Sequence, residues 1–263
     1  MLIVHSLLVI ALLLSGVRPA AAQDLAPRAY VITPLHSSAV NLTWSFYDGG
    51  LNFNGTVPIT GATGTYSIPN ITLYHSFGFF GRSANITVAL PYGVGTFSGQ
   101  VLGSNKSVYR SGLLDFVSRF SVNLIGGPAM QAQEFGKWKQ KVILGAGVWL
   151  YTTNPAFYDI PKPEPQTESP IGSFEGHLSY TFKERAWVSL DGNFWWGGIT
   201  ALNSIRNLKT KQTSSRVGAT VSVPFSKHQA IKASYSKGDY VRFGGNYNNV
   251  QIGWQYSWVG THW

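Results

Sequence analysis

Apolar and polar side chains alternate one by one along most of this chain. Such a period of two is typical of β-strands, because successive side chains of a strand point to opposite faces of the sheet. In residues 40–46, for example, Leu42, Trp44 and Phe46 would share one face, and polar residues lie between them. The pattern predicts ten strands, at residues 40–46, 68–79, 84–90, 114–125, 142–151, 174–182, 188–194, 216–223, 231–236 and 249–258.

The connections between these strands alternate between short and long. Short turns are expected at residues 80–83, 183–186 and 225–229. Long loops rich in Gly, Asn, Ser and Pro are expected at residues 48–66, 93–110, 154–172, 197–214 and 238–248. Residues 126–141 form a connection that is too long for its place among the short turns. Short turns at one end and long loops at the other are typical of outer-membrane β-barrels.

The chemistry of the two strand faces favours a membrane barrel over a soluble one. A soluble sandwich or lipocalin-like barrel would also alternate, but its outer face is usually rich in Lys and Glu. Here the polar face carries mainly Ser, Thr, Asn, Gln and Gly, and the apolar face carries Trp and Tyr near the strand ends. This arrangement suits lipid outside and water inside. The predicted fold is all-β: a single antiparallel transmembrane up-and-down β-barrel of about ten strands, with twelve strands as the alternative.

The first residues of the chain are typical of an export signal. Residues 7–14 are a short apolar run, and the small residues Ala20, Ala21 and Ala22 follow it. The run is much shorter than the roughly 20 apolar residues that a transmembrane helix needs. We therefore expect a cleaved signal peptide and localisation in a bacterial outer membrane. The predicted boundaries are residues 1–22 for the signal peptide, 23–38 for a periplasmic N-terminal segment, 39–258 for the barrel and 259–263 for a C-terminal tail.

Composition removes several classes of function. The chain contains no cysteine, which excludes disulfide scaffolds, thiolate metal sites and cysteine nucleophiles. Its formal net charge is +9, but Lys and Arg are scattered through turns and loops without a basic run. We therefore expect no nucleic-acid partner, and we assign the positive charge to solvated turns and to contacts with anionic lipid headgroups.

The ionisable residues of the strands fall on the polar face, which would line the lumen. The predicted lumen-lining residues are Arg119, Asn123, Glu175, His177, Asp191, Asn193, Arg216, Lys232, Gln251 and Gln255. Isolated charges are costly to desolvate, so opposite charges on neighbouring strands should pair. We expect an ion-paired network of Glu175, Asp191 and Arg216, closed by Lys232 or Arg119.

No motif indicates catalysis or a cofactor. Glu175, His177 and Ser179 would share one strand face, but neighbouring positions on such a face lie roughly 7 Å apart. The chain has no Gly-x-Ser-x-Gly elbow, no H-E-x-x-H zinc motif and no glycine-rich nucleotide-binding loop. We therefore predict no catalytic residue, no bound cofactor and no metal.

The last strand resembles the C-terminal signal that the bacterial barrel-assembly machinery selects. Its residues would be Gln251, Gly253, Tyr256 and Trp258. Five residues follow Trp258, which departs from the usual form of the signal, although the chain still ends on an aromatic residue. The resemblance implies contact with the assembly machinery during biogenesis.

Several stretches resemble the MetA-pathway of phenol degradation family of outer-membrane proteins. They are APRAY at 26–30, HSFG at 75–78, SANIT at 83–87, LPYG at 90–93, RFSVNL at 119–124, GHLSY at 176–180, SRVGAT at 215–220 and WQY at 254–256. The resemblance implies an outer-membrane β-barrel that transports small, hydrophobic or aromatic compounds passively. Family members usually read Gly-Leu-Gly-Asp where this chain has residues 112–115, and they carry an extra strand pair before the segment matching residues 142–151.

Three functions therefore remain open at the level of sequence. The first is a channel or passive transporter in the outer membrane, with membrane lipid and a small-molecule solute as partners. The second is a barrel-borne hydrolase of the lipase or deacylase type. The third is a non-conducting structural or surface-binding barrel.

Overall fold

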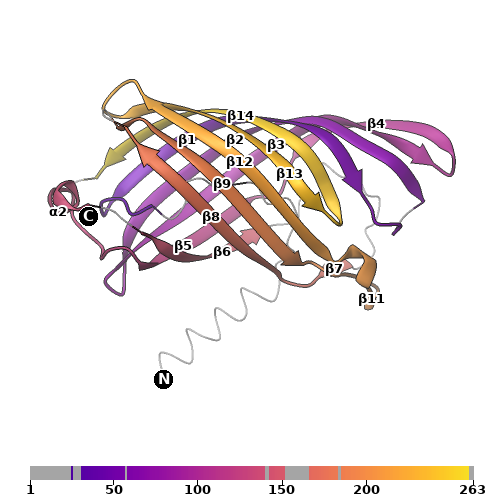
Figure 1. The fold of residues 1–263 in the computed structure, drawn as a ribbon, viewed down its shortest axis with the longest axis horizontal. Coiled ribbons are helices and arrows are strands. Elements are labelled where there is room, and N and C mark those ends of the chain that lie inside the picture. The colour runs from indigo at the N-terminus through magenta and orange to yellow at the C-terminus, as the bar shows by residue number, and fades with distance from the viewer. Residues whose placement is uncertain are drawn as a thin grey trace.

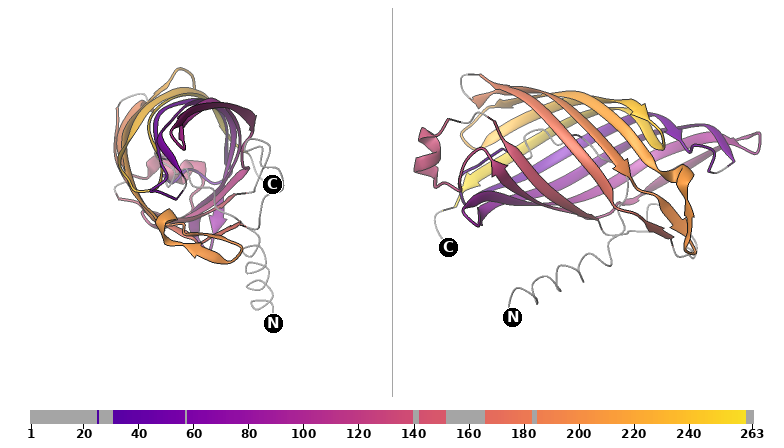
Figure 2. Two further views of the ribbon diagram at one scale, coloured as in Figure 1. Left: turned by 90° about the vertical axis from the view of Figure 1, so that its right-hand side faces the viewer. Right: turned by 60° about the horizontal axis from the view of Figure 1, so that its bottom comes forward.

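Most of the protein is one curled antiparallel sheet with the shape of a barrel, and a small second sheet lies at one end (Figures 1 and 2). The computed structural model describes Leu25 and residues 31–56, 58–139, 142–151, 166–182 and 185–260. The predicted signal peptide lies outside the described residues, as do residues 26–30 of the family resemblance and most of the predicted loop 154–172. No helix in the described part of the chain is long and apolar enough to cross a membrane.

The strands follow one another along the chain with few other elements. They are β1 (Ser37–Asn52), β2 (Ile59–Phe79), β3 (Arg82–Val101), β4 (Ser104–Leu113), β5 (Val117–Ile125), β6 (Leu144–Tyr151), β7 (Gln166–Glu168), β8 (Ile171–Thr181), β9 (Trp187–Gly197), β10 (Thr200–Leu202), β11 (Ile205–Asn207), β12 (Gln212–Pro224), β13 (Gln229–Val241) and β14 (Gly244–Val259). The described helices are α2 (Ala132–Lys137) and the short 3₁₀ turn η2 (Leu208–Thr210).

The sheet has ten strand positions around the barrel, which confirms the predicted number. Its order is β6-β5-β3-β2-β1-β14-β13-β12-β9-β8. β4 is the eleventh strand but takes no position of its own, because it pairs with β3 from Tyr92 to Val101 while β5 pairs with β3 from Ala84 to Ala89. β4 and β5 together therefore form one interrupted crossing. β6 and β8 end the sheet, and the described residues form no ladder between these two strands.

Three of the predicted loops are largely strand, so the prediction of irregular structure there was wrong. β1 and β2 occupy most of residues 48–66, β3 and β4 form a hairpin across residues 93–110, and β13 and β14 occupy most of residues 238–248. Stacked side chains explain the extension. The ring of Tyr66 stacks on that of Tyr47 at 4.7 Å, and the Phe97 ring covers its cross-strand partner Gly64 so closely that a Cβ there would clash. Aromatic rings that cover a cross-strand glycine stabilise an otherwise weak strand position.

The barrel is apolar outside and polar inside. Large apolar side chains are exposed, with Leu178 at 74% and Trp44 at 64%. Small polar side chains are buried at neighbouring positions of the same sheet, including Ser121, Ser189 and Asn193. A soluble barrel has the opposite arrangement, so the soluble alternative does not hold and the fold is that of a transmembrane β-barrel.

The two ends of the barrel carry different structures. α2 and the end of β14 lie at one end, and the small sheet of β7, β10 and β11 lies at the other (Figures 1 and 2). At the α2 end, the Gly260 amide donates to the His36 carbonyl at 2.9 Å, which joins the last described residue to the start of β1. The helix α2 lies within the long connection at residues 126–141.

Residues 31–36 lie within the α2 end of the barrel. Ile32 is completely buried, and the Thr33 hydroxyl lies 2.7 Å from the Tyr74 hydroxyl of β2. The Ser76 hydroxyl donates to the Pro34 carbonyl at 2.6 Å. The described part of the predicted segment 23–38 is therefore held by barrel side chains, while the boundaries of that segment stay a prediction.

Candidate functional site

A cavity of about 920 Å³ lies inside the barrel. Its walls come from nearly every strand of the sheet, together with Leu25, Val31, Thr33 and Pro34 from the chain before β1. Most of the lining positions on β1, β2 and β14 alternate in sequence, as expected for one face of each strand. Because the opposite face is apolar and exposed, the cavity is the place where water and a polar solute can enter this fold.

The structure places the predicted lumen-lining residues in two groups. Those among the cavity walls are Arg119, Glu175, Arg216, Lys232, Gln251 and Gln255. Buried on the inner face of their strands, but outside the cavity lining, are Asn123, Asp191 and Asn193. His177 lies between Glu175 and Asp191.

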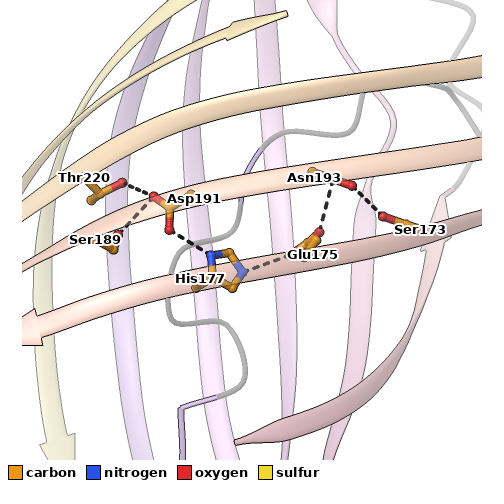
Figure 3. A network of polar contacts seen from close by, with 7 residues as sticks. All are labelled: Ser173, Glu175, His177, Ser189, Asp191, Asn193 and Thr220. Atoms are coloured by element: carbon orange, nitrogen blue, oxygen red, sulfur yellow. Dashed lines mark hydrogen bonds and ion pairs between the residues drawn. The ribbon is translucent and has the colours of Figure 1, made fainter. Parts of the chain in front are cut away.

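His177 is the centre of a polar network on β8 and β9 (Figure 3). Its Nδ1 atom lies 2.8 Å from Asp191 Oδ1, and its Nε2 atom lies 3.4 Å from Glu175 Oε2. The hydroxyls of Ser189 and Thr220 donate to Asp191 Oδ2 at 3.0 and 3.2 Å. The side chains of Asp191 and Glu175 are 0% and 6% exposed, so this imidazole faces two carboxylates away from bulk water.

The network continues from Glu175 toward the end of the barrel that carries the small sheet. The Asn193 amide donates to Glu175 Oε1 at 3.5 Å, and the Ser173 hydroxyl donates to Asn193 Oδ1 at 2.8 Å (Figure 3). All of these residues lie on one face of β8 and β9. The two strands are therefore joined by a continuous row of polar contacts, which adds to their backbone ladder.

The predicted ion-paired network contains the right carboxylates but the wrong cation. Arg216 donates from Nη1 to the Ser236 hydroxyl at 3.0 Å rather than to Asp191. The register of the strands explains the difference, because Asp191 lies directly opposite His177, whereas Arg216 lies opposite Asn193. Neighbouring strands could be inferred from the sequence, but the register between them could not.

Three lumenal cations lie over aromatic rings. The guanidinium of Arg119 is 6.0 Å from the Trp149 ring, and that of Arg216 is 5.7 Å from the Tyr247 ring. The Lys232 ammonium is 5.7 Å from the Trp187 ring. These distances fall within the range of cation–π attraction, which holds a charged group in place without neutralising it.

A group of tyrosines lines the cavity toward the end with the small sheet. The sequence analysis did not predict these residues in the lumen. Tyr47 and Tyr66 stack, and the Tyr247 ring meets both edge-on at 5.8 and 5.3 Å. Each comes from a different strand and belongs to the cavity wall. The predicted strand ended at residue 46, and only the observed extension and register of the strands bring the three rings together.

The arrangement around His177 does not resemble a nucleophile site. Both ring nitrogens face carboxylates, and the nearby Ser189 hydroxyl donates to Asp191 rather than to the imidazole. A serine nucleophile needs the imidazole nitrogen as its base. Among the described residues, no group of three or more His, Asp or Glu side chains is arranged to hold a metal ion.

Glu168, in the small sheet beyond the barrel, has an unusual environment. Its carboxylate accepts a hydrogen bond from Gln212 Nε2 at 3.1 Å. Burial nevertheless raises the pKa of Glu168 to about 7, since desolvation disfavours the charged form more than this hydrogen bond favours it. Glu168 is therefore a group at this end of the protein that titrates near neutral pH.

The residues of the predicted assembly signal lie on β14. Gly253 is buried on the inner face, and the Thr43 side chain occupies the space that a Cβ at this position would need. Tyr256 and Trp258 are exposed on the outer face, with ring centroids 5.7 Å apart. Exposed aromatic residues at the end of a strand suit the interface between lipid and water.

Comparisons with known proteins place the fold. No family model matches this chain, and no curated protein matches it in sequence. Among solved structures, the chain is similar to the COG4313 outer membrane channel from Pseudomonas putida F1, with a TM-score of 0.60 and 10% identity over 89% of this chain and 100% of that chain. The translocator domain of autotransporter NalP from Neisseria meningitidis has a TM-score of 0.42 and 11% identity over 84% of this chain and 88% of that domain. The chain thus shares the barrel fold of a bacterial outer-membrane channel.

Proposed function

We propose that this protein is an outer-membrane channel through which small solutes move passively. The observation that carries the proposal is the polar, charged cavity of about 920 Å³ inside a barrel whose outer face is apolar. Lipid can cover the exposed leucines and aromatics, while the inner face offers hydrogen-bonding groups to water and solute. The structural similarity to the COG4313 outer membrane channel supports the same function.

The proposal includes the finer predictions made from sequence. The chain would be exported by its signal peptide, and β14 would present Gln251, Gly253, Tyr256 and Trp258 to the assembly machinery. The lumenal residues predicted above would line the path of the solute. The resemblance to the MetA-pathway of phenol degradation family and the aromatic rings in the cavity wall favour solutes that are small and aromatic or hydrophobic.

The test is a conductance measurement on the purified full chain in a planar lipid bilayer. We expect discrete, small conductance steps, because inward side chains occupy much of a ten-stranded barrel. A liposome-swelling assay with small neutral solutes provides an independent measure of permeation. Lack of both conductance and swelling, for protein that is folded in the same lipid, would contradict the channel.

The two alternative functions give different results in the same preparation. A hydrolase would release acid from a generic ester or phospholipid. A structural or surface-binding barrel would show neither conductance nor hydrolysis. The experiment therefore distinguishes all three functions that the sequence left open.

A further inference from the structure

The charged residues of the cavity wall are strongly unequal in sign. The basic side chains inside the described part of the cavity are Arg119, Arg216 and Lys232, and Arg185 and Lys227 add positive charge from exposed turns at its rim. The acidic side chains that line it are Asp115 and Glu175. A narrow, low-dielectric passage with an excess of one sign attracts mobile ions of the opposite sign.

The negative charge on this wall is further reduced by the network around His177. Asp191 has a completely buried side chain and is enclosed by His177, Ser189 and Thr220. The imidazole lies between Asp191 and Glu175, and a protonated ring in this position offsets one of the two negative charges. These carboxylates are therefore oriented toward the histidine and not toward a passing ion.

Arg216 is in the opposite situation. Its side chain belongs to the cavity wall although the residue is only 3% exposed. Its partners are neutral, namely the Ser236 hydroxyl at 3.0 Å and the Tyr247 ring at 5.7 Å. Within the described residues, the Arg216 Nε atom has no hydrogen-bond partner.

A buried guanidinium with an unsatisfied N–H is unusual, because burial of a charge is costly unless it is paired. The planar fork of Arg fits a carboxylate through two parallel hydrogen bonds, and Nε is one of the donors that can take part. An anion at this position would complete the coordination of Arg216. Such a site would be occupied only transiently in a conducting lumen.

We infer that the lumen is selective for anions and that Arg216 is the residue that binds them, with small organic carboxylates as the class of solute. This inference rests on the proposed channel function and specifies the charge of the solute that moves through the channel. The excess of basic residues draws anions into the cavity, and Arg216 provides the contact at which they are recognised. A cation of the same size is repelled at each of these positions.

The inference is tested by the zero-current potential of the full-length protein in a planar bilayer with a KCl gradient. We expect the zero-current potential to be shifted toward the equilibrium potential of chloride and away from that of potassium. A bi-ionic measurement with potassium acetate should show that acetate also carries current. Arg216→Gln should lower the permeability ratio of anion over cation by about twofold or more, since it removes one charge from the passage. Arg216→Lys should retain most of the selectivity for chloride.

Arg206→Gln is the matched control, because Arg206 is an exposed arginine on β11, outside the cavity wall. It removes the same charge and should leave the zero-current potential unchanged. Conductance with cation selectivity, or an Arg206→Gln effect equal to that of Arg216→Gln, would overturn the inference while leaving the channel intact. A folded protein that never conducts would overturn both the channel and the inference.

Discussion

Leu178 and Ser179 are neighbours on β8 that meet different surroundings. Leu178 is exposed on the apolar outer face, and Ser179 belongs to the opposite, polar face. An arginine on the lipid face costs about 2–4 kcal/mol at the bilayer midplane, whereas the lumenal face accepts charge. We expect Leu178→Arg to lower the free energy of unfolding in lipid vesicles, measured by urea titration, and Ser179→Arg to have a mild effect. Equal losses from the two variants would show that the face assignment of β8 is wrong.

His177 is expected to stabilise the barrel through its two carboxylate partners. Removing one member of a buried ion pair leaves the rest uncompensated and costs about 3–5 kcal/mol. His177→Gln should therefore lower the urea midpoint strongly, since the Asp191 and Glu175 side chains are 0% and 6% exposed. The double variant His177→Gln with Asp191→Asn should recover part of the loss, because it also removes a buried charge. A double variant that is less stable than the single one would contradict this account.

At the scale of the strands, periodicity predicted more of the fold than of the site. Alternation placed all ten crossings, because a buried polar face and a lipid-facing apolar face impose a period of two. It missed the extension of β1 to β4 beyond the barrel, where glycines covered by aromatic rings replace the simple alternation. It also could not provide the register, so Arg216 was assigned to carboxylates that His177 contacts instead.

The small sheet of β7, β10 and β11 should respond to pH through Glu168. Its pKa of about 7 in the folded protein is above the ordinary value of 4.5, so the folded form retains a proton that the opened form releases. Stability of this sheet is therefore greatest below about pH 4.5, falls as the pH rises toward 7 and is constant above it. We expect amide protection of β10, corrected for intrinsic exchange, to fall over this range.

Glu168→Gln should remove that pH dependence, because the amide remains neutral throughout. Glu134→Gln is a suitable control, since Glu134 is an exposed carboxylate on α2 at the opposite end of the barrel. The control should leave the pH profile of β10 as in the wild type. An unchanged profile in Glu168→Gln would show that another group controls the sheet.

At the scale of the whole molecule, the contrast between the two barrel ends predicts its orientation in the membrane. The turns between β2 and β3 and between β12 and β13 are short and lie at the α2 end, while the β3–β4 hairpin and the small sheet extend from the other end (Figures 1 and 2). Outer-membrane barrels have short periplasmic turns and long extracellular loops. The α2 end should therefore face the periplasm, and the small sheet should face the outside of the cell.

Single cysteines test this orientation directly, because the chain contains no other cysteine. Asn105 lies next to the β3–β4 turn and Lys227 lies in the β12–β13 turn, and both are exposed. A membrane-impermeant maleimide added to intact cells should label Asn105→Cys, while Lys227→Cys should react only after the outer membrane is permeabilised. Since both side chains are exposed in the folded barrel, a difference in labelling reports the membrane rather than local structure. Labelling of Lys227→Cys alone in intact cells would invert the orientation, and the small sheet with Glu168 would then face the periplasm.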